Sequence, residues 1–195
     1  AVKKVDGEVH WRMLRDGLTR VLAQYTPGGK LRDRITYVGN LPLMLERNNK
    51  RFYLMLDHLG SVRVIAGSDN KIRRRIRYDA FGNIALDDNP SFDIPFGYAG
   101  GLADPDTGLV RFVFRDYDPD CGLFTARDPL GPLGGDTHLY GYCLDDPINR
   151  VDWSGLKSGK AGGAAGGSGG GSGLGSSLNK NSKDMGKDGQ DRGPG

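Results

Sequence analysis

Carboxylates are the side chains of this 195-residue sequence best suited to chemistry. Eight aspartates fall between positions 116 and 152: Asp116, Asp118, Asp120, Asp128, Asp136, Asp145, Asp146 and Asp152. Two carboxylates held close together titrate as a unit, so one can activate water while the other protonates a leaving nitrogen. Such a pair can hydrolyse a peptide bond. Most aspartates in a turn-rich chain cap turns instead, and their types and spacing alone do not rank the eight.

Histidine and cysteine give no comparable site. His58 and His138 have no matching ligand pattern around them, and His138 lies in "THLYGY", which has the character of a strand. The two cysteines, Cys121 and Cys143, are far apart and form no C-x-x-C, so we expect them to be unpaired. The sequence therefore predicts neither a metal ion nor a cofactor.

The elements that must position the aspartates are strands. Apolar residues alternate with polar ones in "RFYLMLD" (51–57), "KIRRRIRYD" (71–79) and "LVRFVFRDYD" (109–118). The first run predicts a core face of Phe52, Leu54 and Leu56, with Tyr53 and Met55 opposite. The second predicts Ile72, Arg74, Ile76 and Tyr78 on one face and three arginines on the other. The third predicts Val110, Phe112 and Phe114 on one face and Arg111 and Arg115 on the other.

Turn chemistry separates these runs, and one turn unit recurs. Tyrosine and aspartate are followed within a few residues by glycine in "YDAFGN" and "YDPDCG", and "YTPGG" at 25–29 resembles a decayed copy. Aspartate accepts turn amides, glycine takes the positive φ, and tyrosine offers a large ring to bury. The repeat-motif residues are Tyr78, Asp79, Gly82, Tyr117, Asp118 and Gly122. This pattern predicts an all-β array of hairpins stacked strand on strand.

Charge and hydropathy narrow the class of protein. The net charge is +3, and the segment from residue 157 onward holds six basic residues and three aspartates, so residues 1–156 are neutral. We therefore expect no nucleic-acid partner. No apolar run is long enough to cross a bilayer, and the segment shows no signal-peptide pattern. Because it opens with "AVKKVDGEVHW", we interpret the sequence as part of a longer protein.

Two blocks carry a resemblance to a known family. The segment "RFYLMLDHLGSVRVI…RYDAFGN" resembles the YD repeat. The segment "DYDPDCGLFTARDPLGPLGGDTHLYGYCLDDPINRVDWSGL" resembles the RHS-repeat-associated core that ends the shell of RHS polymorphic toxins and of the C subunit of ABC-type insecticidal toxin complexes. Tyr-Asp-Pro, Arg-Asp-Pro-x-Gly, Gly-Gly, Leu-Tyr-x-Tyr and Gly-Leu occur in order. The resemblance runs from about 41 to 156 and is weaker before.

The resemblance implies an all-β fold of repeated antiparallel hairpins that form part of a spiral RHS shell, closed by a plug-like C-terminal core. We expect degenerate YD-repeat strands at 1–40, YD-repeat hairpins at 41–115, the RHS core at 116–156 and a tail at 157–195. The tail is rich in Gly, Ser and Lys and has too few apolar side chains to offset its ordering entropy, so we predict that it is disordered.

The resemblance also implies that the core acts as an intramolecular aspartyl autoprotease, which cuts the chain after the closing Gly-Leu, between Leu156 and Lys157. The change in composition falls at this same bond.

The family's two motif aspartates fall on Asp128, which heads a D-P-x-G element, and on Asp152. Arg127 matches a family arginine that could bias which carboxylate keeps its proton. Trp153 stands where the family has proline, which puts the alignment of Asp152 in question.

The leading hypothesis is a toxin shell that encloses a C-terminal effector. Its expected partners are its own effector segment, the N-terminal part of the shell, and a secretion apparatus or an immunity protein. Such a chain is secreted or delivered to other cells as part of a larger protein. Two alternatives stay open: a non-catalytic shell remnant whose site Trp153 has disabled, and a cell-surface carbohydrate-binding module built from YD repeats.

Overall fold

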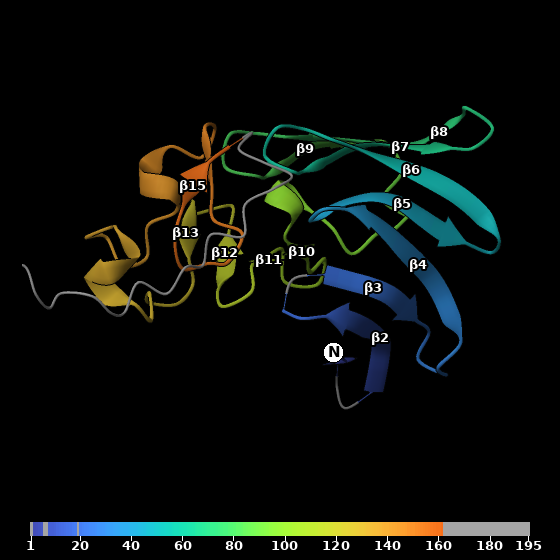
Figure 1. Ribbon diagram of the computed structural model, residues 1–195, viewed down its shortest axis with the longest axis horizontal. Helices are drawn as coiled ribbons and strands as arrows, with labels where there is room; N and C mark the ends of the chain where they lie inside the picture. The colour runs from blue at the N-terminus through green and yellow to red at the C-terminus, as the bar shows by residue number, and fades with distance from the viewer. Residues whose placement is uncertain (1, 6–7, 19, 162–195) are drawn as a thin grey trace, which may run out of the picture.

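The computed structural model describes residues 2–5, 8–18 and 20–161, and its first half is one antiparallel sheet. Each strand pairs with the next along the chain, in the order β1 to β9. The strands are β1 (Val2–Val5), β2 (Glu8–Asp16), β3 (Arg20–Tyr25), β4 (Leu31–Val38), β5 (Leu41–Arg47), β6 (Lys50–Leu56), β7 (Val62–Gly67), β8 (Ile72–Tyr78) and β9 (Ile84–Asp87). Figure 1 shows them as a curved ribbon in blue to green.

The second half is a smaller body of short elements packed beside this sheet (Figure 1). Its elements are η1 (Tyr98–Gly100), β10 (Leu102–Ala103), β11 (Val110–Arg111), β12 (Asp116–Asp118), β13 (Leu123–Phe124), η2 (Gly131–Gly134), η3 (Cys143–Asp145), β14 (Arg150–Val151) and β15 (Gly159–Lys160). Strands β10 to β13 form a four-stranded sheet, and β14 pairs with β15. The predicted all-β hairpin fold is confirmed.

The end of the second body differs from the predicted boundary at residue 157. Residues 157–161 are described, and β15 lies within them. The rest of the predicted tail, residues 162–195, lies outside the described residues.

In β6, period-two alternation correctly predicts which side chains face the core of the first sheet. Phe52 and Leu54 are buried, whereas Tyr53 and Met55 are exposed. In β8 the prediction is wrong for Ile72, which is 45% exposed although Arg74 and Ile76 are buried. The register between β7 and β8 shifts at this point, and such an irregularity breaks the alternation of faces.

The turn after β8 shows why its sequence unit recurs. Asp79 donates its amide to the Asn83 carbonyl (2.9 Å), and its Oδ1 accepts the Asn83 amide (2.9 Å). Gly82 donates to the Asp79 carbonyl and has a φ of +98°. The same main-chain bonds close the turns at 57–61 and 26–30. The first begins with an aspartate, and in the second a threonine takes its place.

The turn after β12 is one residue longer. Gly122 donates its amide to the Asp118 carbonyl (2.9 Å) and has a φ of +70°. Tyr117 is fully buried, and its hydroxyl donates to the Phe81 carbonyl (2.7 Å) in the turn after β8. The two YD turns therefore contact each other directly.

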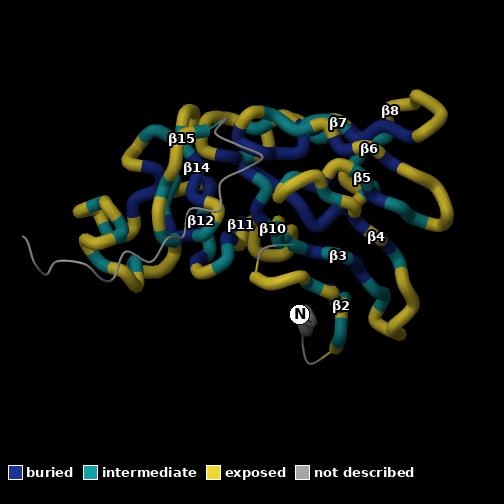
Figure 2. The backbone as a smooth tube through the Cα atoms, viewed as in Figure 1, coloured by how far each residue is buried: buried dark blue, intermediate teal, exposed yellow. Residues whose placement is uncertain are grey.

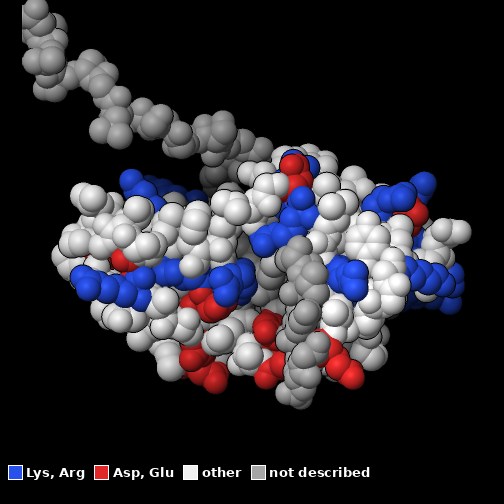
Figure 3. Space-filling view, turned by 90° about the horizontal axis from the view of Figure 1, so that it is seen from below, with Lys and Arg blue, Asp and Glu red and all other residues white. Residues whose placement is uncertain are grey.

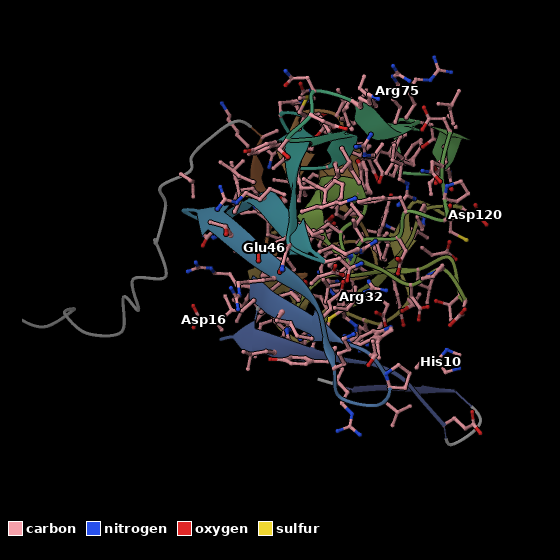
Figure 4. The ribbon with its side chains drawn as sticks, turned by 90° about the vertical axis from the view of Figure 1, so that its right-hand side faces the viewer. His10, Asp16, Arg32, Glu46, Arg75 and Asp120 are labelled. Atoms are coloured by element: carbon pink, nitrogen blue, oxygen red, sulfur yellow. The ribbon has the colours of Figure 1, made fainter. Side chains whose placement is uncertain are left out.

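Two arginines of β8 that reach the surface have aspartate partners. Arg73 pairs with Asp69 at 2.6 Å and Arg75 with Asp88 at 3.2 Å. Arg75 points away from the body of the protein in Figure 4. Basic and acidic side chains likewise share the face seen in Figure 3. Arg73, Arg75 and Arg77 therefore form the solvated face of β8, whereas Arg74 is buried and pairs with Asp87 at 2.6 Å.

A strap at residues 88–97 carries the chain from the sheet to the second body, and two arginines that bind a buried aspartate of the sheet also contact this strap. Asp33 of β4 is fully buried and accepts hydrogen bonds from Arg47 (2.6 and 3.0 Å) and Arg32 (2.8 Å). Arg32 also pairs with Asp93 of the strap at 2.7 Å, and Arg47 stacks on Phe92. A buried carboxylate needs such partners, so the strap and the sheet depend on each other.

Two apolar cores result, visible as dark segments in Figure 2. One lies under the large sheet and includes Leu45, Val62 and Ile65. The other fills the second body with aromatic rings: Tyr98, Phe112, Tyr117, Phe124 and Tyr142. Burial raises the pKa of Tyr98, Tyr117 and Tyr142, which keeps these hydroxyls neutral.

We expect Gly82→Ala to lower the free energy of unfolding by about 2–4 kcal/mol. A Cβ at this position would lie 2.5 Å from the Tyr98 ring, and φ is +98°. Gly29→Ala is the matched control, because Gly29 has a φ of +85° in the same kind of turn with no atom within 4 Å of its Cβ position. Urea unfolding compares the two variants, and equal losses would show that the ring contact contributes nothing.

Candidate active site

Asp128 and Asp152 meet at one arginine. Arg115 Nη2 lies 2.8 Å from Asp128 Oδ2 and 3.6 Å from Asp152 Oδ2. The side chains of Arg115, Asp128 and Asp152 are 4%, 9% and 3% exposed. Charges removed from water to this degree interact strongly, and one guanidinium here neutralises part of the charge of two carboxylates.

Arg115 reaches the carboxylates because the chain turns back after β11. Phe112 donates its amide to the Arg115 carbonyl (3.0 Å), which ends the strand and directs the Arg115 side chain inward. Its Nε donates to the Gly155 carbonyl, and its guanidinium lies 3.7 Å from the centre of the Phe124 ring. Burial lowers the pKa of Arg115, and the two aspartates oppose that shift, so the group stays charged.

Local hydrogen bonds fix each carboxylate. Asp128 begins the turn that leads to η2: its Oδ1 accepts the Leu130 amide at 2.7 Å. Asp152 Oδ1 accepts the amides of Gly155 (2.8 Å) and Leu156 (3.1 Å) and the hydroxyl of Ser154 (2.9 Å). Asp152 is thus bonded to the amide of the residue that carries the predicted scissile carbonyl.

The Leu156 carbonyl lies beside the other aspartate. A Cβ built on Gly134 of η2 would lie 2.8 Å from Asp128 Oδ2 and 3.0 Å from the Leu156 carbonyl oxygen, so these two atoms share the space next to one glycine. Both aspartates, Leu156 and Lys157 line one cavity of about 20 Å³. A polar cavity of this size has room for a water molecule.

A thiol also lines this cavity, but it is poorly suited to act as a nucleophile. Burial raises the pKa of Cys143 to about 12, which keeps the thiol neutral. Among the described residues, no three His, Cys, Asp or Glu side chains come together as a metal site. His138 and Asp136 also line this cavity, so the lining offers three carboxylates and one imidazole as candidate acids and bases, of which Asp128 and Asp152 share Arg115.

The structure does not bring Arg127 to the pair. Arg127 is exposed, and across the described residues it forms no ion pair with either aspartate. The arginine that contacts both aspartates is Arg115, in the place that the sequence had suggested for Arg127. The alternation of 109–118 predicted that Arg115 lies on a polar face. That prediction fails because β11 ends at Arg111, so the alternation does not continue to Arg115. The same turn leaves Phe114 51% exposed, although the alternation placed it on one face with Val110 and Phe112, which are buried.

Trp153 does not occupy the space between the carboxylates. Its side chain is 40% exposed, and its Nε1 lies 3.5 Å from the Leu59 carbonyl in the turn between β6 and β7. The amide of Phe114 donates to the Ser154 carbonyl (3.0 Å). The loop at 152–156 is therefore bound to Leu59 through Trp153 and to Phe114 through Ser154. With tryptophan at position 153 instead of proline, Asp152 still accepts hydrogen bonds from Ser154, Gly155 and Leu156.

The Teneurin YD-shell model matches residues 22–133, more than half of the chain. The chain belongs to the YD-shell family. This YD-shell chain is 31% identical over 118 residues to Teneurin-3 of Danio rerio, covering 58% of this chain and 4% of the relative. It is also 31% identical over 120 residues to double-stranded DNA deaminase toxin A of Burkholderia cenocepacia, covering 60% of this chain and 8% of that protein. The YD-shell chain thus spans a small part of each relative.

Solved structures of shell proteins share its fold. The YD-shell chain superposes on the crystal structure of TcdB2-TccC3-Cdc42 with a TM-score of 0.55 at 20% identity, over 78% of this chain and 10% of that one. A Tc holotoxin pore of Photorhabdus luminescens gives a TM-score of 0.58 at 18% identity, over 84% and 10%. The resemblance to RHS/YD shell proteins is confirmed. Within the described ranges, none of the helical turns has the length and apolar character to cross a membrane.

Proposed function

We propose that this chain is the C-terminal part of an RHS toxin shell and that it cuts its own main chain between Leu156 and Lys157. One observation carries the proposal: Asp128 Oδ2 and the Leu156 carbonyl oxygen lie next to the same glycine, while Asp152 accepts the Leu156 amide. Acid, base and bond are therefore held by the folded chain, which makes the reaction intramolecular.

In the proposed chemistry one of the two aspartates serves as the base and the other as the acid. A water molecule adds to the Leu156 carbonyl carbon and gives a proton to the ionised aspartate, while the protonated aspartate donates to the Lys157 nitrogen. The carbon–nitrogen bond breaks and leaves a carboxylate on Leu156 and an amine on Lys157. Arg115 takes the role of a positioning residue, because it holds both carboxylates and the Gly155 carbonyl next to the reacting bond.

Two features favour this function over a non-catalytic remnant. The indole of Trp153 is directed toward Leu59, away from the aspartates, so it does not disturb their contacts. A turn cap needs only neighbouring amides, whereas Asp152 also shares the Arg115 guanidinium with Asp128, 24 residues earlier in the chain.

We further propose that the segment after the cut leads to an effector enclosed by the complete shell. The whole protein is then delivered to other cells, with a secretion apparatus or an immunity protein as partner. The toxin relative and the fold shared with TcdB2-TccC3 support this assignment.

Intact mass spectrometry of the full chain tests the cut. We expect the parent to give species that correspond to residues 1–156 and 157–195, and Asp128→Asn and Asp152→Asn each to give one uncut chain. Asp120→Asn is the matched control, because Asp120 is an exposed residue of the turn after β12 and lies outside the cavity. A cut that persists in both site variants, or an uncut parent, would contradict the proposal.

A further inference from the structure

The predicted cut lies inside a hairpin whose two arms are both held. Strand β14 precedes the bond and β15 follows it, with Arg150 opposite Lys160 and Val151 opposite Gly159. The bond between Leu156 and Lys157 is therefore in the loop of this hairpin. When a bond in such a loop breaks, the ladder that closes the loop remains.

Contacts on the acyl side do not depend on the bond. The Leu156 amide stays bonded to Asp152 Oδ1 (3.1 Å) and lies 3.1 Å from Ser154 Oγ. The Gly155 carbonyl accepts from Arg115 Nε, and the Gly155 amide donates to Asp152 (2.8 Å). After hydrolysis the new carboxylate of Leu156 would remain between the two aspartates.

Contacts on the amine side hold the downstream segment to the same body. Ala161 donates its amide to the Asn149 carbonyl (2.7 Å) and packs against the aromatic core. Ser158 Oγ lies 3.4 Å from Arg150 Nη1. The new amine of Lys157 is one residue from Ser158, so it stays near the carboxylate from which it was released.

We infer that this site also catalyses the reverse reaction, so that the cut chain is resealed in place. The inference rests on the proposed function. In resealing, the Lys157 amine attacks the Leu156 carboxyl carbon, one carboxyl oxygen leaves as water, and the aspartates return the protons that they carried in hydrolysis. Hydrolysis goes to completion when the products separate, whereas products held face to face meet at very high effective concentration. Cut and intact chains are then in equilibrium.

The test is incubation of the full chain in water enriched in oxygen-18, followed by trypsin digestion in ordinary water. Because Arg150 and Lys157 flank it, "VDWSGLK" is the tryptic peptide that contains the bond in intact chains. We expect this peptide to gain 2 mass units located at Leu156 in the parent and to stay unlabelled in Asp128→Asn. Each round of cutting and resealing leaves oxygen-18 in some of the resealed bonds.

A pair of variants separates resealing from oxygen exchange without a cut. Ala161→Pro removes the amide donor that binds Asn149, so we expect the label in intact chains to fall at least about 10-fold while the cut persists. Ala161→Ser keeps the donor and is expected to behave as the parent. Label that survives in Ala161→Pro would overturn resealing. If cut product forms but intact chains carry no label, resealing is overturned and self-cleavage stands. If the parent gives no cut product and no label, both proposals are overturned.

Discussion

Replacing Arg115 with methionine is expected to abolish the cut and to lower the free energy of unfolding by about 3–5 kcal/mol. Methionine fills a similar volume but leaves Asp128 and Asp152 without the cation that both contact, at 9% and 3% exposure. A buried carboxylate without a partner is costly, and a disordered pair cannot orient water. Intact mass spectrometry and urea unfolding measure the two effects.

Two further variants make this result specific. Arg111→Met removes an arginine whose side chain is 50% exposed and pairs with Asp116, so we expect a loss of less than about 1 kcal/mol and a normal cut. Arg115→Lys keeps the charge but not the planar fork that reaches both carboxylates and the Gly155 carbonyl. It should recover part of the stability without the cut. Normal cutting in Arg115→Met would exclude the positioning role.

We expect Gly134→Ala to slow the cut at least about 100-fold, since an error of about 1 Å at a reacting centre has an effect of this size. A Cβ at this position would lie 2.8 Å from Asp128 Oδ2 and 3.0 Å from the Leu156 carbonyl oxygen, so one or both must move. The backbone φ of Gly134 is not positive, and alanine adopts it without strain. The loss of unfolding free energy should be about 1–2 kcal/mol, typical of overpacking.

A time course of cleavage in freshly refolded protein measures this rate. Gly28→Ala is the control, because Gly28 also lacks a positive φ and its Cβ position has no atom within 4 Å. Equal cleavage rates in the two variants would show that Asp128 and Leu156 do not need the space beside Gly134.

The sequence was sufficient for the hairpin array and for its turn unit. Alternation in β6 and the YD turn after β8 depend on neighbouring residues, and such patterns are readable without tertiary structure. The prediction that Ile72 shares the face of Arg74 and Ile76 failed because the register between β7 and β8 is irregular there. Such an irregularity depends on how two strands pair, so it cannot be predicted from the sequence of either strand alone.

The site was less accessible to this reasoning. Its two aspartates were ranked by resemblance, since eight aspartates in a turn-rich segment look alike by composition. Arg115 was missed because its burial depends on a turn at 112–115 and on the Gly155 carbonyl, 40 residues away. A charged residue in an alternating run is normally solvated, and only the packed structure shows when it is not.

The order of pairing in the large sheet has a consequence for timing. Strands β1 to β9 each pair with the next one along the chain, so the sheet can form progressively as the polypeptide is synthesised. The proposed site cannot, because it needs Arg115, Asp128 and Asp152 brought together from three separate parts of the second body. On the proposed mechanism, the bond after Leu156 breaks only in a chain that has finished folding. On the same proposal, a misfolded chain would keep its downstream segment covalently attached, and the cut would act as a checkpoint on the quality of the shell.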